Sequence, residues 1–342
     1  MRGVGSASLE RMDHVTLRSP AELLAAVPYF FGFPPTHSLV LLAFHGKRIV
    51  FQARADLPPP DELDDAAGHL AEVTARNGPA GVVLIGYGTV PAILPAVEAV
   101  GIKLAQWGIP VLNVLRVDEG RYWEMLCADP VRSPAEGVPF DPSATEFAAR
   151  ATVEGMVVHS DREALVATVA PVEGAGIEPE IAGALDRLRA LSGGRRGLKT
   201  AARTAVRQAV ERYMSGGRLD DDEVAWLAVL LSDLEIRDDT FARIVAAPTV
   251  PEHEEIWRDI VRRVPARYVP APATLLALVA WRAGNGTLAD IAGERALAAD
   301  ASYRLAQLVL HALRQGMPPT ALDDAPVPRR RRRRAPRLSE AA

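Results

Sequence analysis

The sequence has little cysteine, little lysine and no long hydrophobic run. Cys127 is the only cysteine in 342 residues, which excludes a disulfide framework and a zinc site built from several thiolates. A lone thiol suits a reducing compartment, so we expect a cytoplasmic location. The longest apolar stretch outside an expected strand, residues 273–281, is far shorter than the roughly 20 residues that cross a bilayer. The first fifteen residues lack the apolar core of a secretory signal, so we expect neither a membrane span nor export.

Arginine almost replaces lysine in this chain, with 36 arginines against three lysines. Together with abundant alanine, this bias is typical of GC-rich codon usage, as in actinobacteria, and does not indicate arginine-specific recognition. The net charge is −4, but residues 329–342 alone carry +6, so the remaining chain carries −10. A body of that charge disfavours long-range attraction to the phosphates of nucleic acid.

Common catalytic motifs are missing too. The chain has no Gly-x-Ser-x-Gly elbow and no His-Glu-x-x-His zinc motif. His37 and Ser38 are not a catalytic dyad, because successive side chains of a strand point to opposite faces. The histidines lack the spacing of metal ligands, at positions 14, 37, 45, 69, 159, 253 and 311. We therefore predict no metal and no cofactor, and leave open whether the protein is an enzyme.

The chain opens with a helix signal. Ser19 and Glu22 have the spacing of a capping box, in which each side chain satisfies a backbone N–H at the helix start. We expect the helix to stop before Pro28 or near Gly32, since neither residue continues a helix well. A β-hairpin with a tight turn should follow, with strands over residues 38–44 and 49–55.

Positions 17–33 read LRSPAELLAAVPYFFGF. This block resembles the opening of an actinobacterial family known only as a domain of unknown function. Members of that family tend to carry an Arg-x-Asp-x-Gly-Arg-aromatic-Trp run and then a cysteine, matched here by residues 116–123 and Cys127. Paired cysteines can follow this segment in the family, whereas Val131 and Arg132 stand there in this chain. The resemblance implies no activity, and this departure argues against metal or redox chemistry.

Helix and strand patterns alternate up to about residue 142. Continuous apolar runs predict strands buried on both faces, over residues 81–86 and 109–117, and residues 121–126 should pair with the second of them. Helices are expected between the strands, over residues 61–77 and 90–107. The pattern predicts a mixed, partly parallel α/β sheet with flanking helices over residues 17–142, after a disordered segment of residues 1–16.

Nearly every later segment reads as helical, so we predict an all-helical domain over residues 143–320. Residues 270–303 resemble a single tetratricopeptide repeat, with small residues where its two helices would cross, at Ala277, Gly284, Ala289 and Ala296. Arrays need roughly three or more such units. We therefore expect one helical hairpin packed on the rest of the domain, followed by a disordered arginine-rich tail over residues 321–342.

Two loops at expected carboxyl ends of strands are candidate ligand sites. Gly86 and Gly88 lead into a helix whose N-terminus can hold an anion, although we favour a plain tight turn in which the glycines supply positive φ. The next loop carries guanidinium, carboxylate and aromatic groups that can clamp an anionic or planar ligand, from Arg116, Asp118, Arg121, Trp123 and Asp129. The alternative is a structural hairpin in which Asp118 caps the turn and Trp123 packs in the core.

Basic side chains form two further candidate patches. One follows a face of the helix expected over residues 195–215, with Arg195, Lys199, Arg203 and Arg207. It could contact nucleic acid or an acidic partner, or the acidic residues 220–223 could fold back on it. The other lies in the tail, which binds an anionic partner or merely solubilises the end, with Arg329, Arg330, Arg331, Arg332, Arg333 and Arg334.

Our leading hypothesis is a non-enzymatic protein-interaction or regulatory module whose helical half binds a protein partner. The alternative is a small-molecule-binding or hydrolytic α/β enzyme with a site around residues 116–129. A third hypothesis is association with nucleic acid through the arginine tail. All three leave the oligomeric state open.

Overall fold

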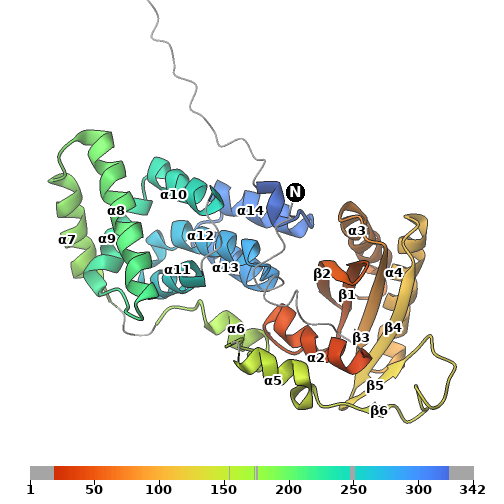
Figure 1. Cartoon of the computed structure of the whole chain (residues 1–342). Coiled ribbons are helices and arrows are strands. Elements are labelled where there is room, and N and C mark those ends of the chain that lie inside the picture. Colours follow the sequence, from red (N-terminus) through yellow and green to blue (C-terminus); the bar gives the residue numbers. More distant parts are fainter. Residues whose placement is uncertain (1–18, 154, 173, 175, 247–250, 323–342) are drawn as a thin grey trace, which may run out of the picture.

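A mixed sheet with flanking helices is followed by a set of helices, as the sequence predicts (Figure 1). The computed structural model describes residues 19–153, 155–172, 174, 176–246 and 251–322. The predicted disordered segment 1–16 and the arginine run of the tail lie outside these residues. Helix α2 (Pro20–Phe31) comes first and begins where the capping signal predicts. The Ser19 hydroxyl accepts a hydrogen bond from the Glu22 N–H at 3.2 Å.

Helix α2 continues through Pro28 and ends at Gly32, which has a φ of 81°. Of the two predicted end points the second is therefore correct. Glycine reaches this left-handed conformation without the steric cost that a Cβ would bring.

In the described residues six strands form one sheet, in the order β2-β1-β3-β4-β5-β6. Their bounds are β1 (Ser38–His45), β2 (Arg48–Asp56), β3 (Gly81–Tyr87), β4 (Val111–Asp118), β5 (Arg121–Glu124) and β6 (Val138–Pro139). The β3–β4 pair is parallel and the other neighbouring pairs are antiparallel. The two-residue β6 is absent from our prediction, because it lies in a stretch rich in proline and glycine and is too short to show a pattern.

Helices cover both faces of this sheet. Helices α3 (Leu63–Arg76) and α4 (Val90–Gln106) pack on one face, with Leu41 and Leu84 in the core between them. Helix α2 packs on the other face, where Tyr29 meets Phe147 of α5 (Glu146–Val153) edge to face, with ring centroids 5.4 Å apart. Strands β1 and β3 are thus buried on both faces, which explains their unbroken apolar runs.

The second half is helical. After η1 (Pro142–Ala144), α5 and α6 (Arg162–Ala167), its elements are α7 (Glu178–Arg189), α8 (Gly194–Met214), α9 (Asp221–Leu231), α10 (Leu234–Ala246), α11 (Pro251–Arg263), η2 (Ala266–Tyr268), α12 (Pro270–Arg282), α13 (Gly286–Ala299), α14 (Arg304–Arg314) and η3 (Pro319–Leu322). Helices α12 and α13 form the predicted hairpin, and Ala277, Ala289 and Ala296 are buried where the two helices meet. Their likeness to a tetratricopeptide repeat stays a prediction.

Besides the contact of α2 with α5, the two halves meet where the chain leaves α14. Gly316 has a φ of +63°, and a Cβ added to it would lie 2.1 Å from Cγ1 of Val73 on α3. The neighbouring polar groups are satisfied across the same contact: Arg76 donates to the Gln315 side chain at 2.8 Å, and the Asn77 amide donates to the Gly316 carbonyl at 3.1 Å. The contact holds the end of α14 against α3 and β2.

Replacing Gly316 with alanine should weaken this contact. We expect Gly316→Ala to lower the free energy of unfolding by about 2–4 kcal/mol, since it adds a clash with Val73 to the strain of a positive φ. The matched control is Gly46→Ala, because Gly46 has a φ of +61° but no atom within 4 Å of an added Cβ. Urea unfolding of both variants measures the difference, and equal losses would contradict a close contact at Gly316.

Candidate functional site

Arg116, Asp118 and Trp123 lie together at one end of the sheet. The Arg116 guanidinium bonds to Asp118 at 2.6 Å, donates to the Gly88 carbonyl at 3.0 Å and lies 3.9 Å from the centre of the Trp123 ring. Register explains the grouping, since Arg116 and Asp118 share a face of β4 and Arg116 stands opposite Trp123 on β5. The Arg116 and Asp118 side chains are 15% and 23% exposed, so their polar groups satisfy one another with little access for a ligand.

The side chains of Arg121 and Asp129 do not join the group around Arg116. Arg121 stands opposite Asp118 in the ladder, but its guanidinium donates to the Gly137 carbonyl at 2.9 Å. The Trp123 indole donates to the Ala135 carbonyl at 3.0 Å, so both side chains hold the loop that leads to β6. The Asp129 carboxylate accepts a hydrogen bond from the N–H of residue 131 at 2.9 Å and shapes a local turn.

The two candidate glycines have packing roles in the structure. A Cβ on Gly86 would lie 2.5 Å from Ile93 of α4, so only glycine lets this helix approach β3 so closely. Gly88 has a φ of +138°, and its N–H donates to the Val117 carbonyl at 2.9 Å. Its carbonyl is the one that Arg116 holds. Of the seven predicted ligand-binding residues, the structure therefore brings four into contact: Gly88, Arg116, Asp118 and Trp123.

The basic stripe on α8 is largely paired within the protein. Lys199 pairs with Glu235 at 2.7 Å, Arg203 pairs with Asp239 at 2.8 Å, and Arg195 pairs with Asp233. Glu235 and Asp239 lie on α10 and Asp233 in the turn before it, whereas we expected residues 220–223. Of that expected set, Glu223 pairs with Arg212, beyond the stripe. Arg207 is exposed to solvent.

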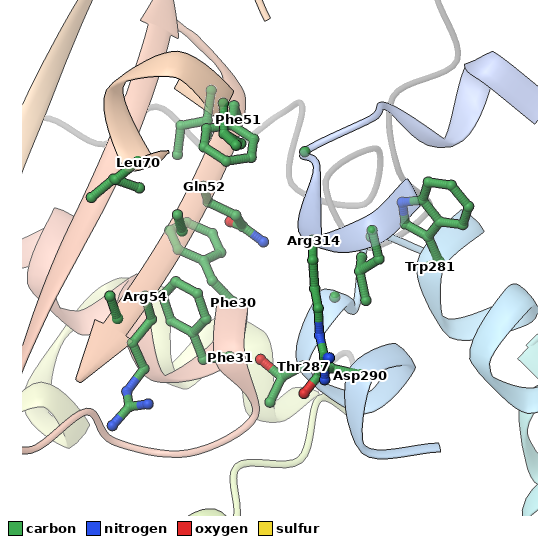
Figure 2. Close-up of a pocket in the computed structure, with 18 of the residues that line it drawn as sticks. Phe30, Phe31, Phe51, Gln52, Arg54, Leu70, Trp281, Thr287, Asp290 and Arg314 are labelled. Carbon is green, nitrogen blue, oxygen red and sulfur yellow. The ribbon is translucent and has the colours of Figure 1, made fainter. Parts of the chain in front are cut away.

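A cleft of about 1210 Å³ opens between the two halves, and no sequence motif pointed to it. All nine residues of β2 line it on one side. Figure 2 shows Phe51, Gln52 and Arg54 of β2 on one side, with Arg314, Thr287 and Asp290 of the helical half opposite them. The aromatic lining also includes Phe30, Phe31, Phe33 and Trp281.

The outer edge of β2 faces this cleft. β2 pairs with β1 on one side and with no other strand of the described residues. The Leu57 N–H donates to the His37 carbonyl at 3.3 Å, which fixes the phase of the ladder. Backbone groups of an antiparallel strand point alternately toward its partner and away from it. The Leu57 backbone groups point toward β1, and the pairing is regular from there back to residue 51. The N–H and C=O groups of Gln52 and Arg54 therefore point outward, away from β1.

Polar side-chain atoms in the cleft also have spare bonding capacity. Gln52 Oε1 and Arg54 Nε are buried without a hydrogen-bond partner among the described residues. The Arg54 guanidinium otherwise pairs with Asp56 at 2.6 Å and lies 5.3 Å from the centre of the Phe33 ring. On the opposite wall Arg314 pairs with Asp290 at 2.9 Å. Of the aromatic lining, Phe51 is half-buried and Phe30, Phe31, Phe33 and Trp281 are buried, so the accessible hydrogen-bonding groups of the cleft are mainly those of the β2 backbone.

A sequence signal for part of this site exists. Gln52 and Arg54 are polar at alternate positions of a strand, on the face that carries Val40 and Leu42 of β1 toward the core. Long polar side chains on an otherwise apolar face indicate that the core stops at that strand. The opposite wall gives no such signal, since it depends on how α14 packs.

The described residues contain no group of three or more histidine, cysteine, aspartate or glutamate side chains arranged to hold a metal ion. None of the described helices is long and apolar enough to cross a membrane.

The sequence matches the family described as Domain of unknown function (DUF4192) over residues 20–320. The chain belongs to this family. The match begins in α2 and ends in η3, so the DUF4192 domain includes the sheet, the helical half and both walls of the cleft. No curated protein and no solved structure gives a significant match to the chain.

Asp239 should make stability depend on pH. Hydrogen bonds from Arg203, and then from Arg243, hold the pKa of Asp239 far below its usual value. A lowered pKa in the folded state stabilises the protein above the unfolded pKa of about 4, and this stabilisation disappears as the pH falls. We expect Asp239→Asn to lower the free energy of unfolding by about 0.5–1 kcal/mol at pH 7, a modest effect because the pair is solvent-accessible.

Urea unfolding at pH 7 and near pH 2 tests this expectation. The difference between wild type and Asp239→Asn should be clearly smaller at the lower pH, because the unfolded carboxyl group is then protonated. Glu98→Gln is the control, because Glu98 is exposed on α4. A difference that stays constant with pH would show that the ion pairs of Asp239 do not cause it.

Proposed function

We propose that this protein is a non-enzymatic binding module that takes an extended segment of a partner protein into the cleft between its halves. The observation that carries the proposal is the outer edge of β2. All nine residues of β2 line the cleft, and this edge has outward backbone groups at Gln52 and Arg54. An extended peptide adds to such an edge as a further strand, and its backbone hydrogen bonds contribute affinity.

The surroundings of β2 indicate which side chains the partner carries. Phe30 and Phe31 of α2 line the cleft on one face of the sheet, and Leu70 and Val73 of α3 line it on the other. Successive side chains of an added strand point to these two faces in turn. A segment rich in apolar, β-branched or aromatic residues therefore fits both faces.

The helical half closes the third side of the cleft. Trp281 at the end of α12 and Met317 after α14 line it there. An added strand would contact the helical half as well as the sheet. This arrangement supports the hypothesis of a protein-interaction module and extends it to both halves.

The other hypotheses gain less support. An enzyme site around residues 116–129 needs free polar groups, whereas the Arg116 guanidinium is already engaged by Asp118 and Gly88. Three of the four basic side chains of the α8 stripe have carboxylate partners, which reduces its attraction to phosphate.

Peptide selection and binding test the proposal. Peptides selected on the full-length protein from a displayed library should be extended and apolar, and a labelled one gives an affinity by fluorescence anisotropy. Gln52→Pro removes the outward N–H, while Gln52→Ala keeps it and removes the side chain. Proline is tolerated on edge strands, so Gln52→Pro should fold. We expect Gln52→Pro to bind about tenfold more weakly than Gln52→Ala, as the loss of a buried hydrogen bond implies.

Circular dichroism and thermal unfolding check that both variants fold. If Gln52→Pro unfolds, Arg54→Pro and Arg54→Ala replace the pair, because Arg54 also directs its backbone groups outward. Failure to select any peptide, or equal affinities for the proline and alanine variants, would contradict strand addition at β2.

A further inference from the structure

We propose that the segment after α14, residues 315–322, is a strap that closes one end of the cleft and separates from α3 while the rest of the fold stays intact. As a control on partner binding the strap rests on the proposed function, whereas its opening does not. The proposal is carried by where the strap lies, by which of its hydrogen bonds reach α3, and by how the two halves are joined elsewhere.

The strap lies against β2 next to the outward groups of that strand. A Cβ added to Gly316 would lie 2.1 Å from Cγ1 of Val73 and 3.5 Å from Cε2 of Phe51. Directly opposed residues of neighbouring strands have Cβ atoms about 4.5–5.5 Å apart, so a strand added to β2 would place a side chain beside the Phe51 ring. The strap occupies space next to that ring. An added strand therefore competes with the strap.

The backbone hydrogen bonds of the strap stay within the helical half. The N–H groups of residues 315, 316 and 317 donate to carbonyls of α14 at 2.9 to 3.1 Å, in the pattern with which helices commonly end at a left-handed glycine. Pro318 and Pro319 have no N–H to donate. The last part of the strap, η3, contacts α12. The strap therefore keeps its shape when it moves with the helical half.

Side chains make the hydrogen bonds between the strap and α3 in the described part of the chain. Arg76 donates to the Gln315 side chain at 2.8 Å, and the Asn77 amide donates to the Gly316 carbonyl at 3.1 Å. Arg76 is exposed, and its other ion pair stays within α3, with Glu72 at 2.5 Å. Exposed groups exchange such bonds for bonds to water, so each contributes only modestly to stability. The strap can leave α3 without unfolding either half.

A second contact keeps the halves together when the strap opens. The His159 N–H donates to the Gly32 carbonyl at 2.7 Å, and a Cβ added to Gly32 would lie 3.3 Å from Leu165 of α6. Helix α6 in turn contacts α13. This connection through α2, α6 and α13 does not involve the strap. The cleft can therefore open at the strap while the halves stay joined at α6.

Access to the edge of β2 then depends on the fraction of molecules in which the strap is open. A ligand that binds only the open form has an apparent dissociation constant equal to its intrinsic value divided by that fraction. A change that loosens the strap tightens partner binding by the same factor, as long as the open form is rare. The strap would thereby set the affinity of the cleft for its partner.

Cysteine labelling with N-ethylmaleimide tests the opening without any partner. Val73 is 5% exposed beneath the strap, and Val73→Cys in a Cys127→Ser background leaves a single thiol. The matched control is Val100→Cys, because Val100 is 3% exposed in the core between α4 and the sheet. Gln315→Ala removes the side-chain acceptor of Arg76 and leaves α3 unchanged. We expect it to speed the labelling of Val73→Cys about fivefold, as the loss of one hydrogen bond implies, and to leave Val100→Cys unchanged.

A second variant and the selected peptide complete the test. Asn77→Ala should also speed the labelling of Val73→Cys, because it removes the other side-chain donor to the strap. The affinity of the peptide for Gln315→Ala, measured by fluorescence anisotropy, should tighten by the same factor as the labelling rate rises.

Unchanged labelling of Val73→Cys in both variants would overturn the proposal, as would an equal rise at Val100→Cys, which reports global unfolding. Faster labelling of Val73→Cys without tighter peptide binding would refute the control of binding by the strap. Faster labelling of Val73→Cys when no peptide can be selected supports the opening of the strap and refutes the proposed function.

Discussion

The α14 side of the cleft depends on one contact, the packing of Gly316 against Val73. A glycine at this position brings the end of α14 close to α3 and β2, because any larger side chain would overlap Val73. The hydrogen bonds from Arg76 and Asn77 hold the same segment in place. Because this segment packs on α3 and β2, the outer edge of β2 does not face open solvent. It faces the helical half across the cleft. The free strand edge is therefore protected from uncontrolled pairing with other chains, which is the usual hazard of such an edge.

The polar groups around Arg116, at the end of β4, differ from those of β2 because they are already paired with one another. There Arg116, Asp118, Trp123 and the Gly88 carbonyl satisfy one another, and Arg121 holds the loop before β6. This mutual pairing leaves few groups for a ligand. Unused hydrogen-bonding capacity is found instead at β2, where Gln52 and Arg54 have buried atoms without partners in the described structure.

Local signals predicted most of the elements. The cap at Ser19, the apolar runs of β3 and β4, and the small residues of the α12–α13 hairpin each depend on neighbours close in sequence, so the sequence alone reveals them. The edge position of β2, the short β6 and the acidic partners of Lys199 and Arg203 depend on contacts between residues far apart in the chain. The cleft belongs to this second group. The charged and aromatic run at residues 116–123 carries groups typical of a ligand site, yet Arg116, Asp118 and Trp123 contact one another.

Backbone pairing of a partner with β2 is tested most directly by N-methylation of a bound peptide. Methylation of one amide at a time along a selected peptide removes each N–H in turn and leaves the side chains unchanged. In an added strand successive N–H groups point alternately toward β2 and away from it. We expect affinity losses at every second position, of about tenfold where the N–H faces β2. Losses that repeat every three or four positions, or no loss at any position, would contradict strand addition.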